Sequence, residues 1–126
     1  MRPSDLGYLK SHEWCRMDGD IATIGITDFA VSHLSDLVFL DLPQKGSTVT
    51  AGESFGEIES VKAVSDLYSP VTGEVVDANA ELQDNLEWLA EEPFGKAWML
   101  KVKVTAKSPD LMDAKAYEEH CAAESH

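Results

Sequence analysis

One lysine stands out among the residues that could do chemistry, because strand-like sequence runs into it and out of it. Lys62 lies between apolar and β-branched residues, and Pro70 and Gly73 then mark a turn before a further β run. The hairpin has no Asn-Gly or Asp-Gly pair, so it predicts a turn without positive φ. A lysine at such a tip suits an enzyme that attaches a group to its amine. A lysine there is also common as a plain solvated charge.

The segments around this hairpin predict a mainly β domain with short helices. Residues 21–26 are rich in β-branched side chains, and Thr27 or Asp28 is expected to cap a short helix after them. Many short strands with frequent turn signals are typical of a small barrel or sandwich. We expect one domain over 1–126, with an N-terminal extension of about 1–7, strands over 21–26, 37–40 (buried), 72–78 and 98–104, a helical turn within 81–92, and a C-terminal helix over about 109–121 opened by Ser108 and Pro109.

Composition excludes several classes of partner. Aspartate and glutamate number 23 against 10 lysines and arginines in 126 residues, a net charge of -13. Such a chain repels phosphate backbones and anionic lipids, so we expect no nucleic-acid partner and no membrane partner. The two cysteines, Cys15 and Cys121, lie far apart and suggest a reducing compartment. With no visible targeting segment, we expect a cytoplasmic bacterial protein, or a mitochondrial matrix protein if a leader was removed.

No enzyme signature is present, so we predict that the chain is not an enzyme and has no catalytic residues. It lacks a Gly-x-Ser-x-Gly motif, a phosphate-binding glycine loop and a His/Cys pair at zinc spacing. His120, Cys121 and His126 cluster near the end of the chain, but three candidate ligands at a fraying end are a weak basis for a metal. We therefore predict no metal site.

The lysine segment closely resembles the lipoylation site of glycine cleavage system H proteins. The matching sequence is Glu-Ser-Val-Lys-Ala-Val-Ser-Asp at 59–66, followed by Ser-Pro-Val-Thr-Gly-Glu-Val at 69–75. Residues 11–14, 24–28 and 93–95 match as well, and the resemblance runs from about Tyr8 to Tyr117. It implies a flattened, pseudo-symmetric barrel-sandwich hybrid of the lipoyl/biotinyl-carrier type, with short peripheral helices and a C-terminal helix.

The function that this resemblance implies is that of a carrier with lipoic acid covalently bound to Lys62. Such a carrier moves the aminomethyl group of glycine from the decarboxylating glycine dehydrogenase to the aminomethyltransferase. A dihydrolipoyl dehydrogenase then reoxidises the dihydrolipoyl group. These three enzymes and the lipoate-attaching enzymes are the implied partners, and we expect the carrier to be a monomer.

The resemblance also implies which residues of this sequence occupy the family's site positions. Glu59 and Gly73 match positions that lipoyl-attaching enzymes recognise, although Gly73 could simply serve the turn after Pro70. The remaining matches belong to a cleft that holds the aminomethyl-loaded arm, where carboxylates suit a cationic amine. These cleft positions are Ser11, Glu13 and Asp66, with His33 at the side of the cleft.

The chain also departs from the family pattern. Leu86 stands where a proline is usual, Ala90 where an asparagine is usual, and Ala97 where a glycine is usual. Val61 and Ala63 flank the lysine, whereas biotin carriers have Met-Lys-Met and the lipoyl domains of dehydrogenases favour Asp-Lys-Ala. Two alternatives stay open: a relay protein that hands lipoyl groups to other enzymes, and an unmodified interaction domain of the same fold.

Overall fold

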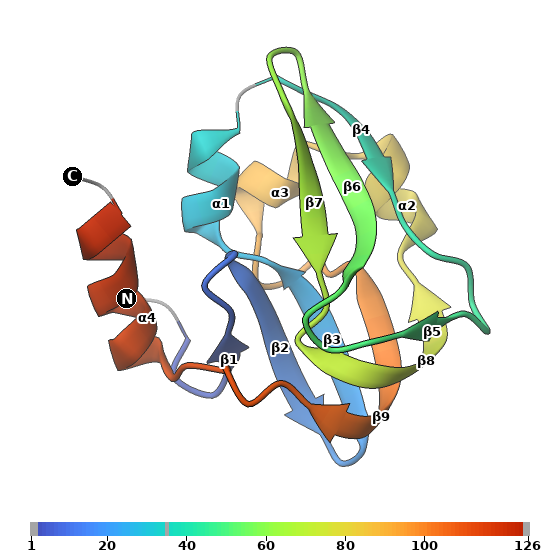
Figure 1. Cartoon of the computed structure of the whole chain (residues 1–126). Coiled ribbons are helices and arrows are strands. Elements are labelled where there is room, and N and C mark those ends of the chain that lie inside the picture. The colour runs from blue at the N-terminus through green and yellow to red at the C-terminus, as the bar shows by residue number, and fades with distance from the viewer. Residues whose placement is uncertain (1–2, 35, 125–126) are drawn as a thin grey trace.

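Two antiparallel sheets pack together in the computed structural model, which describes residues 3–34 and 36–124 (Figure 1). The larger sheet has the order β1-β2-β3-β9-β8-β5 and the smaller has the order β4-β6-β7. The strands are β1 (Gly7–Tyr8), β2 (Glu13–Asp18), β3 (Ile21–Ile26), β4 (Leu37–Asp41), β5 (Thr48–Val49), β6 (Ser54–Ser60), β7 (Val64–Tyr68), β8 (Val71–Ala78) and β9 (Leu100–Lys107). The helices are α1 (Asp28–His33), α2 (Ala80–Asp84), α3 (Trp88–Glu91) and α4 (Ala114–Glu124). This architecture confirms the predicted mainly β sandwich with peripheral helices.

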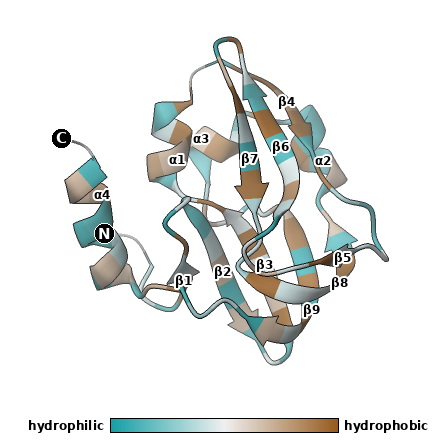
Figure 2. Ribbon diagram, viewed as in Figure 1, coloured by the Kyte–Doolittle hydropathy of each residue, from teal (hydrophilic) through white to brown (hydrophobic). Residues whose placement is uncertain are grey.

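The core lies between the sheets, and a second apolar cluster lies under α4. Ile24 and Val102 from the larger sheet and Ile58 and Leu40 from the smaller are almost completely buried. Hydrophobic and hydrophilic positions alternate along the strands in Figure 2, as expected when one face of each sheet is buried. The second cluster holds α4 against the edge of the larger sheet beside β1. Its buried aromatic members are Tyr8, Trp14 and Tyr117.

Several sequence predictions are confirmed in detail. The strand predicted over 21–26 is β3, and the strand predicted over 72–78 is β8, which begins one residue earlier. Thr27 is the N-cap of α1, where its side chain accepts a hydrogen bond from the N–H of Ala30 at 3.3 Å. The acidic stretch over 81–92 contains α3 and most of α2. Cys15 and Cys121 are both buried and are not joined in a disulfide.

The segment 37–40 is a strand as predicted, but the expectation that it is buried is wrong. Val38 is 54% exposed and Phe39 is 49% exposed, whereas Leu40 is buried. The cause is the position of β4 at the edge of the smaller sheet, where it pairs only with β6 and has an irregular register between Leu37 and Phe39. Edge strands place only part of their side chains against a core.

The boundaries near both ends of the chain also differ from prediction. The helix predicted over 109–121 begins only at Ala114, because Ser108 instead accepts the N–H of Asp110 in a turn. Asp113 serves as the cap of α4, accepting the N–H of Ala116 at 2.8 Å. The strand predicted over 98–104 begins at Leu100, and the proposed extension over 1–7 overlaps β1, which opens at residue 7.

None of the helices in the described part of the chain has the length and apolar run that a membrane crossing requires.

Candidate functional site

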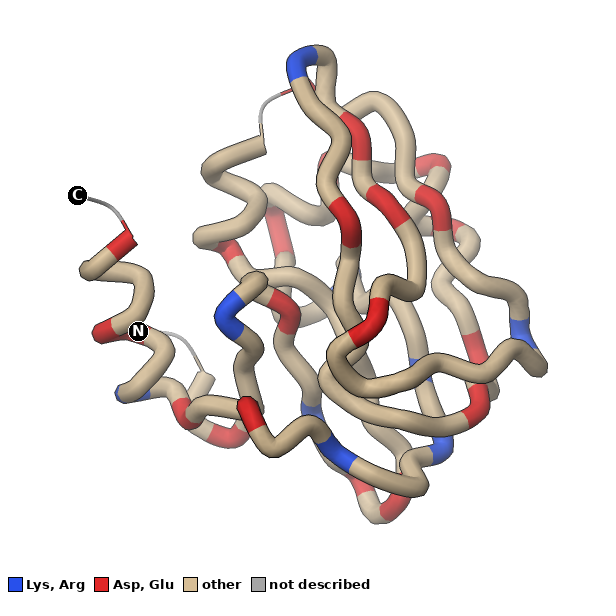
Figure 3. The backbone as a smooth tube through the Cα atoms, viewed as in Figure 1, with Lys and Arg blue, Asp and Glu red and all other residues tan. Residues whose placement is uncertain are grey.

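Lys62 lies at the tip of the β6–β7 hairpin, as the sequence predicts. The last paired residues are Glu59 and Val64, and the loop between Ser60 and Val64 exposes the lysine. Ser60 closes this loop twice: its N–H donates to the carbonyl of Ala63 at 2.8 Å, and its hydroxyl oxygen accepts the N–H of Ala63 at 3.1 Å. Figure 3 shows the basic residue alone at this tip, above acidic positions on both strands.

The loop around Lys62 is stiffened without backbone strain of its own. Among the described residues outside glycine, only His12 and Asp36 have positive φ, so the predicted turn without positive φ is confirmed. The N–H of Val61 donates to the carbonyl of Asp36 at 3.1 Å and so ties the tip to the start of β4. Val61 and Val64 are exposed large hydrophobic residues on either side of the lysine. The amine is therefore presented on a fixed, partly apolar tip.

A cleft of about 340 Å³ lies beside the hairpin, and the predicted cleft residues meet there. Ser11, Glu13, Asp66 and His33 all line it. They come from separate parts of the chain: Asp66 is on β7, His33 is on α1, Glu13 opens β2 and Ser11 lies in the loop before it. The apolar part of the lining is made by Ile26, Phe29, Ala30, Leu34, Ile58 and Leu67.

Glu13 is the most perturbed carboxyl group of the cleft. It is almost completely buried, and burial raises its pKa to about 7. The hydroxyl of Ser11 donates to one carboxylate oxygen, and the N–H of Tyr68 donates to the other at 2.9 Å. These two hydrogen bonds partly offset burial by favouring the ionised form. A cation that entered the cleft would stabilise the carboxylate further.

Glu59 and Gly73, the two predicted recognition residues, lie in different environments. Glu59 is partly exposed on β6, opposite Phe39 and Val64 and three residues before Lys62. Gly73 is buried within β8, so it does not form the turn after Pro70. A Cβ atom on Gly73 would lie 2.0 Å from the carbonyl oxygen of Lys103 on β9. Close backbone approach is thus a packing reason for glycine at this position.

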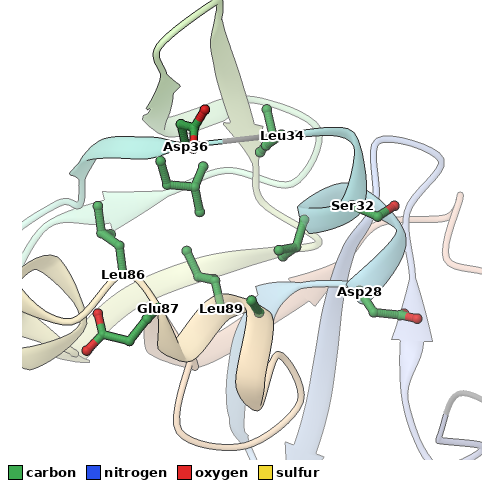
Figure 4. Close-up of a pocket in the computed structure, with 10 residues that line it drawn as sticks. Asp28, Ser32, Leu34, Asp36, Leu86, Glu87 and Leu89 are labelled. Atoms are coloured by element: carbon green, nitrogen blue, oxygen red, sulfur yellow. The ribbon is translucent and has the colours of Figure 1, made fainter.

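A larger cavity of about 620 Å³ lies against α1 and α3, as Figure 4 shows. Leu86 and Ala90, two of the departures from the family pattern, line it, and Ala97 is buried in the core. The lining combines leucines and a valine with the acidic residues Asp28, Asp36 and Glu87. Among the described residues, its lining includes no lysine, histidine or cysteine. We assign no function to it.

One polar cluster at the edge of the 340 Å³ cleft was not predicted. His12 Nε2 lies 2.6 Å from a carboxylate oxygen of Glu124, whose other oxygen lies 3.3 Å from His120 Nε2. Burial lowers the pKa of His12, and the neighbouring Glu124 opposes that shift. The sequence carried only a partial signal, the i,i+4 spacing of His120 and Glu124 on one helix face. Their meeting with His12 depends on how α4 packs.

Comparisons with known proteins agree along nearly the whole chain. The family described as "Glycine cleavage H-protein" matches residues 6–124. The glycine cleavage system H protein of Rubrobacter xylanophilus is 53% identical over 115 residues, covering 91% of this chain and 90% of that protein. The probable glycine cleavage system H protein of Haloarcula marismortui is 53% identical over 119 residues, covering 93% and 94%. A crystal structure of a glycine cleavage system H protein from Mycobacterium marinum superposes with a TM-score of 0.88 at 39% identity, covering 99% of this chain and 100% of that one.

Proposed function

Because this chain belongs to the glycine cleavage H-protein family, we propose that lipoic acid is attached to Nζ of Lys62 through an amide bond. The chain is a lipoyl carrier of glycine cleavage, and the two alternatives, a lipoyl relay and an unmodified interaction domain, are not favoured. The observation that carries the assignment to this residue is the exposed position of Lys62 on a hairpin tip closed by Ser60. An enzyme can reach an amine there without opening the fold.

The surroundings of Lys62 fit a long covalent arm. The hairpin that carries the lysine also supplies Ala63, Ser65 and Asp66 to the lining of the 340 Å³ cleft, so an arm that folds back from the tip meets this cleft. Apolar side chains such as Ile58 and Leu67 suit the hydrocarbon part of the arm. When bound, lipoic acid supplies a dithiolane that can take up the aminomethyl group and undergo reduction.

The residues of the cleft would hold the amine of the loaded arm. Glu13 and Asp66 provide carboxylates, and charge-assisted hydrogen bonds to a cationic amine are among the stronger ones in proteins. Ser11 orients the carboxylate of Glu13 through its hydrogen bond. A bound cation would shift the pKa of Glu13 down from about 7 and so favour its ionised form. His33 stands at the cleft wall, where its Nδ1 lies 2.9 Å from the carbonyl of Phe29.

The proposed partners are those of a carrier. They are the decarboxylating glycine dehydrogenase, the aminomethyltransferase, the dihydrolipoyl dehydrogenase and the lipoate-attaching enzymes, with Glu59 as a contact for the last of these. A tether keeps the carried group at a high effective concentration for each partner in turn. The exposed side chains of Val38, Phe39, Val61 and Val64 near the tip support docking of partner proteins there. The cytoplasmic location and monomeric state stay predictions.

The test is lipoylation of the purified chain by a lipoate-attaching enzyme, followed by intact mass and fragmentation of the Lys62 peptide. We expect one added lipoyl group on wild type and none on Lys62→Arg, which should also abolish glycine decarboxylation in a reconstituted system. Lys62 is exposed, so the substitution should change the free energy of unfolding by less than about 0.5 kcal/mol. Lys45→Arg, at another exposed lysine, is the matched control and should be modified normally. Full modification or full activity of Lys62→Arg would overturn the assignment.

A further inference from the structure

We propose that His12, His120 and Glu124 form a binding site for Zn²⁺ or a closely related divalent transition-metal ion at the edge of the cleft. Their candidate ligand atoms, the two imidazole Nε2 atoms and the Glu124 carboxylate, all lie within 4.8 Å of one another. Two imidazoles and one carboxylate are a ligand set that zinc uses in proteins, with a fourth position left open. The site is separate from lipoyl attachment and does not depend on it.

The geometry is close to what the ion requires. Zinc–ligand bonds of about 2.0–2.2 Å in a tetrahedral arrangement place the ligand atoms roughly 3.3 Å apart. The Glu124 oxygens lie 2.6 Å from His12 Nε2 and 3.3 Å from His120 Nε2. The side chain of Glu124 is 41% exposed and that of His120 is 23% exposed. Both therefore have room for small rotations that would move their ligand atoms by about 1 Å, to the distances that a coordinated zinc ion requires.

His12 is the ligand that the fold holds in place. Its Nδ1 lies 2.7 Å from the hydroxyl of Tyr117, which in turn lies 2.5 Å from the hydroxyl of Thr27. This chain of hydroxyls lets Nδ1–H donate to Tyr117 and leaves the lone pair of Nε2 for an ion. Histidines that bind metals usually donate their other ring N–H to such an acceptor. The backbone of His12 has φ of 80°, a conformation that side-chain-bearing residues rarely adopt outside functional or tightly constrained sites.

The other two ligands share one helix face. His120 and Glu124 are four residues apart on α4, which packs against the edge of the larger sheet through Tyr117 and its neighbours. His120 Nε2 lies 3.1 Å from the carbonyl oxygen of Lys10, and metal binding would exchange this hydrogen bond for a metal bond. Without an ion, the same three side chains form a hydrogen-bonded cluster that ties α4 to the loop before β2. The experiment must separate these two roles.

The three ligands favour particular metal ions, and the open coordination position lies beside the cleft. Imidazole ligands suit Zn²⁺, Cu²⁺ or Ni²⁺, whereas Mg²⁺ and Ca²⁺ prefer oxygen-only sets. His12 and Glu124 line the 340 Å³ cleft together with Ser11 and Glu13. The fourth position of a bound ion therefore lies next to the cleft, where water or a thiolate could fill it.

The test is a Zn²⁺ titration of the full chain, stripped of metal beforehand, against a chromophoric chelator. We expect one ion per chain, bound at least about 10-fold more weakly by His120→Gln and by Glu124→Gln, since loss of even a supporting residue costs that much in metal sites. Saturating Zn²⁺ should raise the midpoint of thermal unfolding of wild type but not of these two variants. His33→Gln is the matched control, because His33 lines the same cleft outside the cluster.

The result that would overturn the proposal is Zn²⁺ binding that is absent from wild type, or equal in wild type and both variants. The cluster would then be a structural hydrogen-bonded group only. His126 lies outside the described residues, so His126→Gln is titrated as well. A loss of binding in His126→Gln with full binding in Glu124→Gln would place the ion at the end of the chain and refute the assignment. Far-ultraviolet circular dichroism and urea midpoints establish that each variant is folded.

Discussion

Replacing Gly73 by alanine should destabilise the fold by about 3 kcal/mol, which is a strong test of the packing between β8 and β9. Gly73 pairs with Val104, next to an irregularity in the register of the two strands. A Cβ atom at residue 73 would lie 2.0 Å from the carbonyl oxygen of Lys103 and 2.9 Å from a methyl carbon of Val102. Carbon–oxygen contacts across strands are normally about 3.3–3.6 Å, so the strands would have to separate by more than about 1 Å.

The size of the expected loss of stability follows from the backbone groups that Gly73→Ala would displace. Overpacking a core usually costs about 1–3 kcal/mol, and a backbone carbonyl cannot swing aside as the end of a side chain can. We therefore expect the upper end of that range for Gly73→Ala. Whole domains are stable by only about 5–15 kcal/mol. With a urea m-value of about 2 kcal/mol/M, the midpoint should fall by roughly 1.5 M.

Urea unfolding of Gly73→Ala, with lipoylation measured in parallel, separates packing from enzyme recognition. Gly95→Ala is the matched control, because its Cβ would meet only the side chain of Glu92, at 3.3 Å, and should change stability by less than about 0.5 kcal/mol. Glu59→Ala, at a partly exposed position on β6, should lower the rate of lipoylation more than it lowers stability.

A wild-type urea midpoint for Gly73→Ala would refute the packing argument. If lipoylation of that stable variant nevertheless failed, Gly73 would be a recognition residue first. A large loss of stability with normal lipoylation of the folded fraction would assign it to packing alone. Equal losses of lipoylation and stability in Glu59→Ala would make Glu59 structural as well.

Two further predictions concern buried polar groups. Burial raises the pKa of Glu13 from its ordinary 4.5 to about 7, so its contribution to stability is fully present below pH 4.5 and is lost as the pH rises through 7. Glu13→Gln should therefore reduce the fall in the free energy of unfolding between pH 5 and pH 8, measured by urea unfolding in the presence of a chelator. An unchanged pH dependence would show that Glu13 is not the group that causes it. Trp14→Phe removes an indole N–H that donates to the carbonyls of Ile26 and Pro93 at 3.0 Å each, and should cost about 1–3 kcal/mol by the same measurement. A loss below about 0.5 kcal/mol would mean that water replaces the indole.

The local sequence pattern was enough to predict the elements whose residue types match their burial in the fold. The strand Ile21–Ile26 is dense in β-branched residues, and its helix cap at Thr27 is a short-range feature. The exposure of Val38 and Phe39 could not be predicted, because an apolar run does not say whether a strand is central or at an edge. Serine followed by proline is a pattern shared by helix starts and turns, and in this chain the Ser108 hydroxyl accepts the N–H of Asp110 in a turn.

The candidate site also has parts that the local sequence predicts and parts that depend on tertiary structure. The turn around Lys62 is encoded locally, because Ser60 closes it with groups three residues away. The cleft depends on tertiary structure, because Ser11, just before β2, and Asp66, on β7, line it together although they are far apart in the sequence. Their assignment came from resemblance to a family. The cluster of His12 and Glu124 joins segments near both ends of the chain and had no such guide.

Thr27 connects the cleft to the C-terminal helix through a continuous set of hydrogen bonds. Its hydroxyl caps α1, the helix that carries the cleft residue His33, and the same oxygen lies 2.5 Å from the hydroxyl of Tyr117 on α4. Tyr117 in turn holds His12, which lies at the edge of the cleft. The wall of the cleft and the contact between α4 and the rest of the fold therefore depend on one buried network of hydrogen bonds. A substitution that left one of its polar groups without a partner would be costly. Lys62 lies on a different element, the β6–β7 hairpin, which supplies Ser65 and Asp66 to another part of the cleft lining.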